Sequence, residues 1–259
     1  VGLEVFKPEA DQTYHIDVIP YVVGQYNKNA EVGDEYFELS YAVYNNLGVN
    51  EKRYIAIGEQ CGMRDPVAEH FANLRAQGAE WDDMKNFKPK WRQLMLWYVH
   101  EQAEKGLQLY EGAFGTFGEK LDEELADAEE AWADNFDDPD GGATLRVRFK
   151  GQNIGQANLW VRASSIKFIE RPNGFEGPAD VLNKAADIQL ESCLKVATYD
   201  ELKAVLEGRP VVETTYGQPS GTGSNGATTS TVDDDDAAPW DEPAAKEPEP
   251  EAPKPNRKS

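Results

Sequence analysis

The sequence predicts a mainly β protein with inserted helices, in which a folded core is followed by a disordered acidic C-terminal tail. Short stretches of alternating apolar and polar residues recur over residues 13–170, with turn-forming Gly, Asn, Asp and Pro between them. Few helical patterns interrupt these stretches, which indicates a small barrel or sandwich. The apolar pattern stops near residue 213, so the folded core is assigned to residues 1–212.

The first strands are predicted at residues 13–19, 37–44 and 53–57. A longer strand over 93–100 is apolar on both faces, which is typical of a buried strand. It is followed by a turn at Lys105-Gly106 and a second apolar segment, so the two are expected to pair as a hairpin.

Asp65 followed by Pro66 supplies an N-cap and a proline at the first helical position, and Gly78 ends the helix predicted there. Thr198 and Glu201 match a capping box before an apolar run that ends at Gly208.

An acidic helical insertion is predicted over residues 116–140. Thr116 and Glu119 match a capping box, and an apolar stripe at helical spacing runs to Trp132. The opposite face is almost entirely Glu and Asp and is interpreted as a solvated surface. The stretch ends in a turn at Pro139, which lacks the spacing of a calcium-binding loop.

The formal net charge of −21 argues against a nucleic-acid partner unless the acids lie away from the binding surface. Residues 213–259 hold 10 acids and 4 bases, and residues 119–140 hold 11 acids and 1 base. These two blocks carry −16 of the charge, which leaves −5 for the rest of the chain. Cations can therefore gather on the remaining surface.

One such gathering precedes and enters the strand at 93–100, where cations alternate with aromatic rings. Lys88, Lys90 and Arg92 surround Trp91. Cations suit the phosphates of a single nucleic-acid strand, and exposed rings give unpaired bases a surface on which to stack. Trp97 lies deeper in the strand and is either a core residue or a second stacking ring.

A second gathering has the clearest strand pattern in the chain. Arg146, Arg148 and Lys150 alternate with apolar residues, so they share one face of an extended strand. Trp160, Arg162 and Lys167 follow on the next predicted strand, and no acid occurs from residue 144 to 165. This face is either the solvated side of a sheet or a binding surface. The full set of candidate DNA-binding residues is Arg53, Tyr54, Lys88, Lys90, Trp91, Arg92, Tyr98, Arg146, Arg148, Lys150, Trp160, Arg162 and Lys167.

Enzyme signatures are missing from the sequence: it has no phosphate-binding Gly-rich loop, no G-x-S-x-G and no H-E-x-x-H. The three histidines follow no metal-site or triad pattern, so we expect no enzymatic activity and no cofactor or metal. A metal-dependent nuclease using Asp17 or Asp134 with Asp138 is kept as an alternative. No apolar run reaches the roughly 18 residues of a membrane span, and the two cysteines favour a reducing compartment.

Beyond the core, residues 213–232 are predicted to form a Gly/Ser/Thr linker and residues 233–259 an acidic, Pro-rich tail. Asp233, Asp234, Asp235, Asp236 and Trp240 are its candidate partner-binding residues. The tail either solubilises the protein, competes with a nucleic-acid strand for the cations, or binds partner proteins through Trp240.

The order of several segments resembles bacteriophage single-stranded DNA-binding proteins of the T4 helix-destabilising kind and their podophage relatives. The segments that carry the resemblance are FKP…HIDVIPYVVG, CGMRDPVAEH, KPKWRQLMLWYV, EKGLQLYEG, DPDGG, LRVRFKGQNIGQANLWVRASSIKF and the acidic DDDDAAPW. It spans roughly residues 6–171 and the tail. The family places a zinc-binding cysteine cluster near Cys61, but Asp65 and Ala68 stand where further thiolates are expected, so the resemblance implies a lost zinc site.

The resemblance implies an OB-fold-like β-barrel that coats single-stranded DNA during viral replication, recombination and repair, in the cytoplasm of the infected bacterial host. It also implies that the tail recruits viral or host replication proteins such as a polymerase, helicase or primase. A protein-interaction adaptor working through the tail is the main alternative, and single-stranded RNA would suit the same surface.

Overall fold

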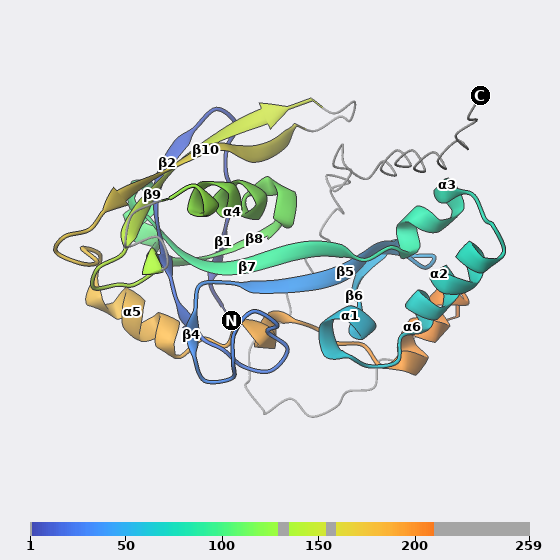
Figure 1. The fold of residues 1–259 in the computed structure, drawn as a ribbon. Helices are drawn as coiled ribbons and strands as arrows, with labels where there is room; N and C mark the ends of the chain where they lie inside the picture. Colours follow the sequence, from blue (N-terminus) through green and yellow to red (C-terminus); the bar gives the residue numbers. More distant parts are fainter. Residues whose placement is uncertain (1, 129–134, 154–158, 210–259) are drawn as a thin grey trace, which may run out of the picture.

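The computed structural model describes residues 2–128, 135–153 and 159–209. This part of the chain is mainly β, with a curled half-barrel sheet and several helices, as the sequence predicts (Figure 1). The strands are β1 (Glu4–Phe6), β2 (Thr13–Ile19), β3 (Tyr21–Val22), β4 (Glu35–Tyr36), β5 (Leu39–Leu47), β6 (Lys52–Ile55), β7 (Lys90–Val99), β8 (Leu107–Ala113), β9 (Ala143–Gln152) and β10 (Trp160–Glu170). The α-helices are α1 (Ile57–Cys61), α2 (Pro66–Ala76), α3 (Trp81–Met84), α4 (Gly118–Ala126), α5 (Ala179–Ala186) and α6 (Tyr199–Leu206). Short 3₁₀ turns are η1 (Lys85–Phe87), η2 (His100–Lys105), η3 (Phe114–Thr116) and η5 (Leu190–Cys193).

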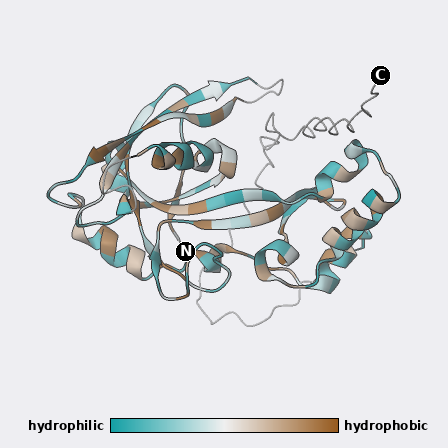
Figure 2. Cartoon of the chain, viewed as in Figure 1, coloured by the Kyte–Doolittle hydropathy of each residue, from teal (hydrophilic) through white to brown (hydrophobic). Residues whose placement is uncertain are grey.

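Strand β7 organises the sheet, whose main order is β1-β8-β7-β2-β9-β10. Its first half pairs with β5 and its second half with β2, while β8 runs antiparallel along its other edge. The turn η2 joins β7 to β8, which confirms the predicted hairpin. Figure 2 shows β7 teal at its Lys90 end and brown further along, where it enters the core.

The inner face of the curled sheet packs against α4 (Figure 1). Trp97 is fully buried there and stacks on Tyr110 with ring centroids 3.9 Å apart, which confirms that Trp97 is a core residue. Leu121 of α4 belongs to the same cluster. A Cβ on Gly118 would lie 2.2 Å from the Gln93 side chain, so glycine permits this close approach of α4 to β7.

A second apolar cluster lies on the outer face of β7 and β8. Leu94, Leu96 and Tyr98 pack there against Val181 of α5 and Leu190 of η5. The segment after β10 therefore covers the outer face of β7 and β8. At the far end of the sheet, a third cluster joins β5 to α1, α2 and α6.

Two predicted helix starts are confirmed. The Asp65 carboxylate accepts a hydrogen bond from the Val67 backbone N–H at 2.9 Å, at the start of α2. Thr198 and Glu201 form the predicted capping box of α6.

The predicted capping box at Thr116 is wrong. Phe117 is the N-cap of α4, and within the described residues no side chain caps this helix. The Thr116 hydroxyl instead donates to the Ala113 carbonyl at 2.6 Å and lies 2.8 Å from the Tyr110 hydroxyl. The hydroxyl is thus engaged by the preceding strand and the η3 turn.

Helix α4 ends at Ala126, and the predicted continuation through Trp132 falls partly on residues 129–134, outside the described part. The turn around Pro139 is confirmed: the Gly142 N–H donates to the Asp138 carbonyl at 2.9 Å. The predicted linker at 213–232 and tail at 233–259, including Asp233 to Asp236 and Trp240, also lie outside the described residues.

Candidate nucleic-acid interface

The outer face of the β9–β10 hairpin carries five cations. Arg146, Arg148 and Lys150 are exposed along β9, while Leu145, Val147 and Phe149 are buried on the other side. Across the hairpin, Arg162 lies opposite Lys150 and Lys167 lies opposite Arg146. Directly opposite residues of an antiparallel pair project from the same face, so the register brings all five cations together. We call Arg146, Arg148, Lys150, Arg162 and Lys167 the hairpin cations.

The hairpin cations are not neutralised by carboxylates of the described residues. None of the five forms an ion pair within 2–128, 135–153 or 159–209. This contrasts with the rest of the surface, where most arginines pair with a neighbouring acid, as Arg64 does with Glu69 at 2.5 Å. Like charges gathered on one face create a positive potential that an anionic polymer can reduce.

Trp160 does not contribute an exposed ring to this face, contrary to prediction. It is only 3% exposed. The Arg162 guanidinium carbon lies 5.2 Å from the centre of its ring, within the range of a cation–π contact. A ring buried to this extent leaves no face on which a base could stack.

Two of the predicted cations, Arg53 of β6 and Arg92 of β7, are engaged by one acid. Arg53 Nη1 lies 3.0 Å and Arg92 Nε 3.2 Å from Glu111 Oε1, which also accepts a hydrogen bond from the Tyr41 hydroxyl at 2.8 Å. Arg92 is 9% exposed, so its charge is buried against this carboxylate. Burial, and then the charge of Glu111, raise the pKa of Tyr41. Arg53 and Arg92 are thus held in an ion cluster with Glu111, and their role with phosphates stays a prediction.

The rings predicted here divide into buried and exposed ones. Tyr98 is 6% exposed and packs edge-on against Phe175 at 5.3 Å, so its predicted role in stacking is contradicted. Tyr54 is half-buried and packs against the third apolar cluster. Trp91 is 42% exposed, and the Lys28 ammonium lies 5.8 Å from the centre of its ring. Lys88 lies in the same way 5.7 Å from the ring of Trp81.

The two predicted gatherings of cations lie on separate surfaces. Lys90 and Arg92 project from the same face of the sheet as the hairpin cations, but α5 and η5 cover the apolar surface between the two groups. Trp91 projects from the other face, together with Gln93 and the core residue Trp97. The β9–β10 face and the start of β7 are therefore separate surfaces.

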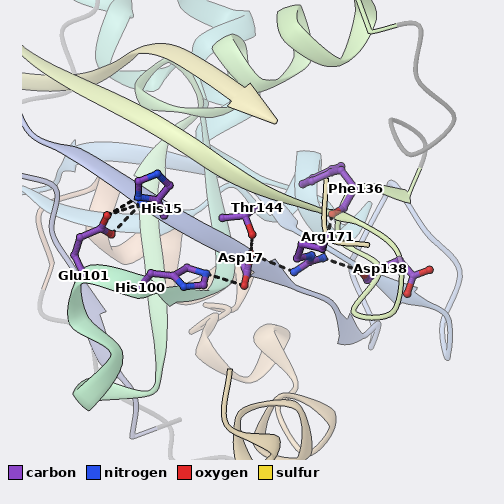
Figure 3. Close-up of polar contacts among 8 residues, drawn as sticks. All are labelled: His15, Asp17, His100, Glu101, Phe136, Asp138, Thr144 and Arg171. Carbon is purple, nitrogen blue, oxygen red and sulfur yellow. Dashed lines mark hydrogen bonds and ion pairs between the residues drawn. The ribbon is translucent and has the colours of Figure 1, made fainter. Parts of the chain in front are cut away.

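A buried polar network lies beside the hairpin cations, and Figure 3 shows the residues of this network. Asp17 is fully buried, and its carboxylate accepts a hydrogen bond from the Thr144 hydroxyl at 2.5 Å. Its oxygens also lie 3.2 Å from Arg171 Nη1 and 3.0 Å from His100 Nε2. Arg171 Nη2 donates to the Asp138 carbonyl at 2.7 Å, so Arg171 joins the end of β10 to the turn before β9.

His15 continues this border and lies opposite Arg146. Glu101 accepts hydrogen bonds from the backbone N–H of His15 at 2.9 Å and contacts the imidazole Nδ1 at 2.7 Å (Figure 3). Burial opposes ionisation of Glu101, but these contacts with His15 outweigh it and lower the pKa of Glu101. Glu101 is thereby paired with His15, the residue that lies opposite Arg146.

Two features of these surfaces carried no usable sequence signal. Lys28 is an isolated cation in a turn-rich segment, so no periodicity indicates its contact with Trp91. Arg171 and Asp17 are far apart in the chain, and only the tertiary fold pairs them. In the described residues, no group of three or more His, Cys, Asp or Glu side chains is arranged to hold a metal ion. Cys61 is half-buried, and the His70 ring packs edge-on against Phe87.

None of the helices in the described ranges has the length and apolar character that crossing a membrane requires. Comparison of the chain with protein-family models finds no match, and comparison with curated proteins finds no significant relative.

Proposed function

We propose that this protein binds single-stranded DNA independently of sequence through the outer face of the β9–β10 hairpin, on an OB-fold-like barrel. The observation that carries the proposal is the gathering of five hairpin cations on one face, none paired with a carboxylate of the described residues. In a chain with a net charge of −21, such a surface is selective for a polyanion.

The mechanism is non-catalytic and needs no cofactor. The hairpin cations neutralise phosphates and release counterions, which makes the affinity depend on salt. Five phosphate contacts to a single strand predict a slope of about −3.5 in a plot of log K against log salt. Binding should therefore weaken about a hundredfold between about 50 and about 200 mM salt.

The biological setting follows from the sequence resemblance. We propose that the protein coats single strands during viral DNA replication, recombination and repair in the infected bacterial cytoplasm. The acidic tail would modulate DNA binding and recruit a polymerase, helicase or primase.

A titration of the full chain with fluorescent oligothymidylate at two salt concentrations tests the proposal. The variant Arg146→Ala with Arg148→Ala should bind more weakly and lower the magnitude of the salt slope by about 1.4, because two of five contacts are lost. Both side chains are exposed, so the folded state should persist. A matched control, Arg64→Ala with Arg209→Ala, removes two exposed arginines elsewhere and should preserve the slope.

The same titration separates the alternatives. An adaptor that works only through the tail predicts no affinity for oligothymidylate at low salt, and that result would overturn the proposal. Equal binding by the Arg146/Arg148 variant and the parent would show that DNA does not bind to the β9–β10 face. Titration with an RNA oligomer of matched length shows whether the protein has the higher affinity for DNA or for RNA. A nuclease would cleave the DNA in magnesium; of its candidate residues, Asp17 is fully buried against Arg171, and Asp134 lies outside the described residues.

A further inference from the structure

We propose that Trp91, Tyr26 and Lys28 form a preorganised platform on which the bases of the single strand stack, apart from the hairpin cations. The inference rests on the proposed function and adds a second contact zone to it. Among the large hydrophobic side chains exposed in the described ranges, only two are aromatic, and these are Tyr26 and Trp91, at 40% and 42%.

The segment around Tyr26 is fixed beside Trp91 by a buried glutamine. Gln60 is 2% exposed, and its Nε2 donates to the Tyr26 carbonyl at 2.8 Å. Its Oε1 accepts from the Ala42 N–H at 3.0 Å, and Ala42 lies directly opposite Trp91 in the β5–β7 pair. One side chain therefore connects the backbone of Tyr26 to the strand pair that carries Trp91.

Two asparagines anchor the same segment from its other side. Asn27 Nδ2 donates to the Glu38 carbonyl at 2.9 Å, and its Oδ1 accepts from the Asn29 N–H at 2.8 Å. Asn29 Nδ2 donates to the Glu38 carboxylate at 3.1 Å. These hydrogen bonds hold the backbone of the segment, while the side chains of Tyr26 and Lys28 remain exposed.

The backbone of Tyr26 adopts a conformation that its side chain does not favour. Its φ is +78°, in the left-handed region where residues other than glycine are strained. The exposed ring gains little from burial to offset that strain. Strain retained at an exposed aromatic residue is typical of a site selected for binding.

Lys28 gives the platform its charge. Its ammonium lies 5.8 Å from the centre of the Trp91 ring, and no carboxylate in the described residues forms an ion pair with it. Lys28 lies over a ring that is 42% exposed, so the ammonium can hold a phosphate while a neighbouring base stacks on the exposed part of the ring. This combination favours a nucleic-acid strand over an apolar peptide, which would gain nothing from the ammonium.

The test compares oligothymidylate with an abasic oligomer of the same length, using the full chain at low salt. The parent should prefer the oligomer that has bases. Trp91→Ala should weaken binding to oligothymidylate about tenfold, since one stacked base is worth about 1–3 kcal/mol, and should leave abasic binding within about twofold. Trp91→Phe should reduce the fluorescence quenching that oligothymidylate causes in the parent.

Tyr26→Gly separates binding from folding. Glycine adopts a φ of +78° without strain, so the variant should melt at the same temperature as the parent or higher. It should nevertheless lose several-fold affinity for oligothymidylate and little for the abasic oligomer. Val32→Ala, which trims an exposed side chain of the neighbouring loop, is the matched control and should change neither.

The outcomes distinguish the two proposals. If the parent fails to bind oligothymidylate at low salt, both are overturned. If the parent binds and the Arg146/Arg148 variant is weakened, but Trp91→Ala and Tyr26→Gly keep the parental preference for bases, only the platform is overturned.

Discussion

Arg162 and Lys167 lie five residues apart on β10 and nevertheless project from the same face of the sheet. In a regular strand, residues separated by an odd number point to opposite faces. The register shift between Ala163 and Ser165 leaves Ser164 without a partner on β9, and this β-bulge restores Lys167 to the face of Arg162. The bulge thereby completes the set of hairpin cations.

Deleting Ser164, the unpaired residue of the bulge, should therefore keep all five hairpin cations on one face. The pairs of Arg162 with Lys150 and of Lys167 with Arg146 remain, and the hydrogen bond from the Ser164 hydroxyl to the Arg148 carbonyl, 3.0 Å long, is lost. We expect a stability loss of about 1 kcal/mol and DNA affinity within about twofold of the parent. Urea unfolding and oligothymidylate titration measure the two quantities. A drop in affinity as large as that of the Arg146/Arg148 variant would contradict this role of the bulge.

Reversing one charge should weaken DNA binding more than removing it. Lys167→Glu places a carboxylate directly opposite Arg146, where the two can pair. We expect a larger loss of affinity than for Lys167→Ala, because the acid both removes one contact and occupies a second cation. Lys184→Glu on α5 makes the same change in net charge away from the hairpin and is the control. Equal losses for the two Glu variants would indicate an effect of net charge alone.

The Asp17–Arg171 pair should dominate the stability of the border network. Their side chains are 1% and 6% exposed, so removing Arg171 leaves the Asp17 charge buried with Thr144 and His100 but without the guanidinium. Arg171→Met should lower the free energy of unfolding by about 3–5 kcal/mol. Asp17→Asn combined with Arg171→Met should cost less than the sum of the single changes. Urea unfolding of all four proteins gives the coupling, and additive losses would show that the pair does not act as a unit.

Glu38 should make stability decrease as the pH rises from about 4.5 towards neutrality. Burial raises the pKa of Glu38, and the charge of Asp122 adds to that rise, while hydrogen bonds from Ser40, Gln93 and Asn29 oppose it. A carboxyl whose pKa is raised in the folded state binds its proton more tightly there than in the unfolded chain. Its contribution to stability is therefore complete below the unfolded pKa and is lost as pH rises through the folded pKa.

Glu38→Gln removes this titration. The introduced amide can donate to Gln93 Oε1 once the Gln93 amide turns over, because this oxygen accepts no hydrogen bond from the described part of the chain. The stability of the variant relative to the parent should therefore increase between about pH 4.5 and about pH 7. Thermal melts across this range measure it. A difference that stays constant with pH would assign the pH dependence to another group.

The parts of the fold that were predicted correctly depend on neighbours in the sequence. The alternation of Arg146 and Arg148 with Val147 fixes which side of β9 faces the core, because a strand has a period of two. The caps of α2 and α6 involve residues within three positions of each other, at Asp65 and Thr198. The failed capping box at Thr116 shows the limit of such local patterns. The Thr116 hydroxyl contacts the Tyr110 hydroxyl of the preceding strand and does not cap the helix.

The contacts of the candidate site residues that the sequence did not reveal involve residues distant in the chain. Arg53 and Arg92 match a phosphate-binding pattern, yet Glu111 on β8 engages both. Tyr98 follows a strand pattern that does not reveal Phe175, which covers it. Tyr26 carried no pattern at all: its left-handed φ and the hydrogen bond from Gln60 to its carbonyl are visible only in the folded chain.

The sequence by itself determined the β character of the core, the cationic side of β9 and the location of most of the surplus acid. Each of these is a property of adjacent or alternating residues. Only the tertiary structure decided which cations meet a carboxylate, which rings are covered and which surfaces are continuous. The physical reason is that burial and charge pairing depend on distances between side chains, and the curled sheet brings together residues as far apart as Asp17 and Arg171.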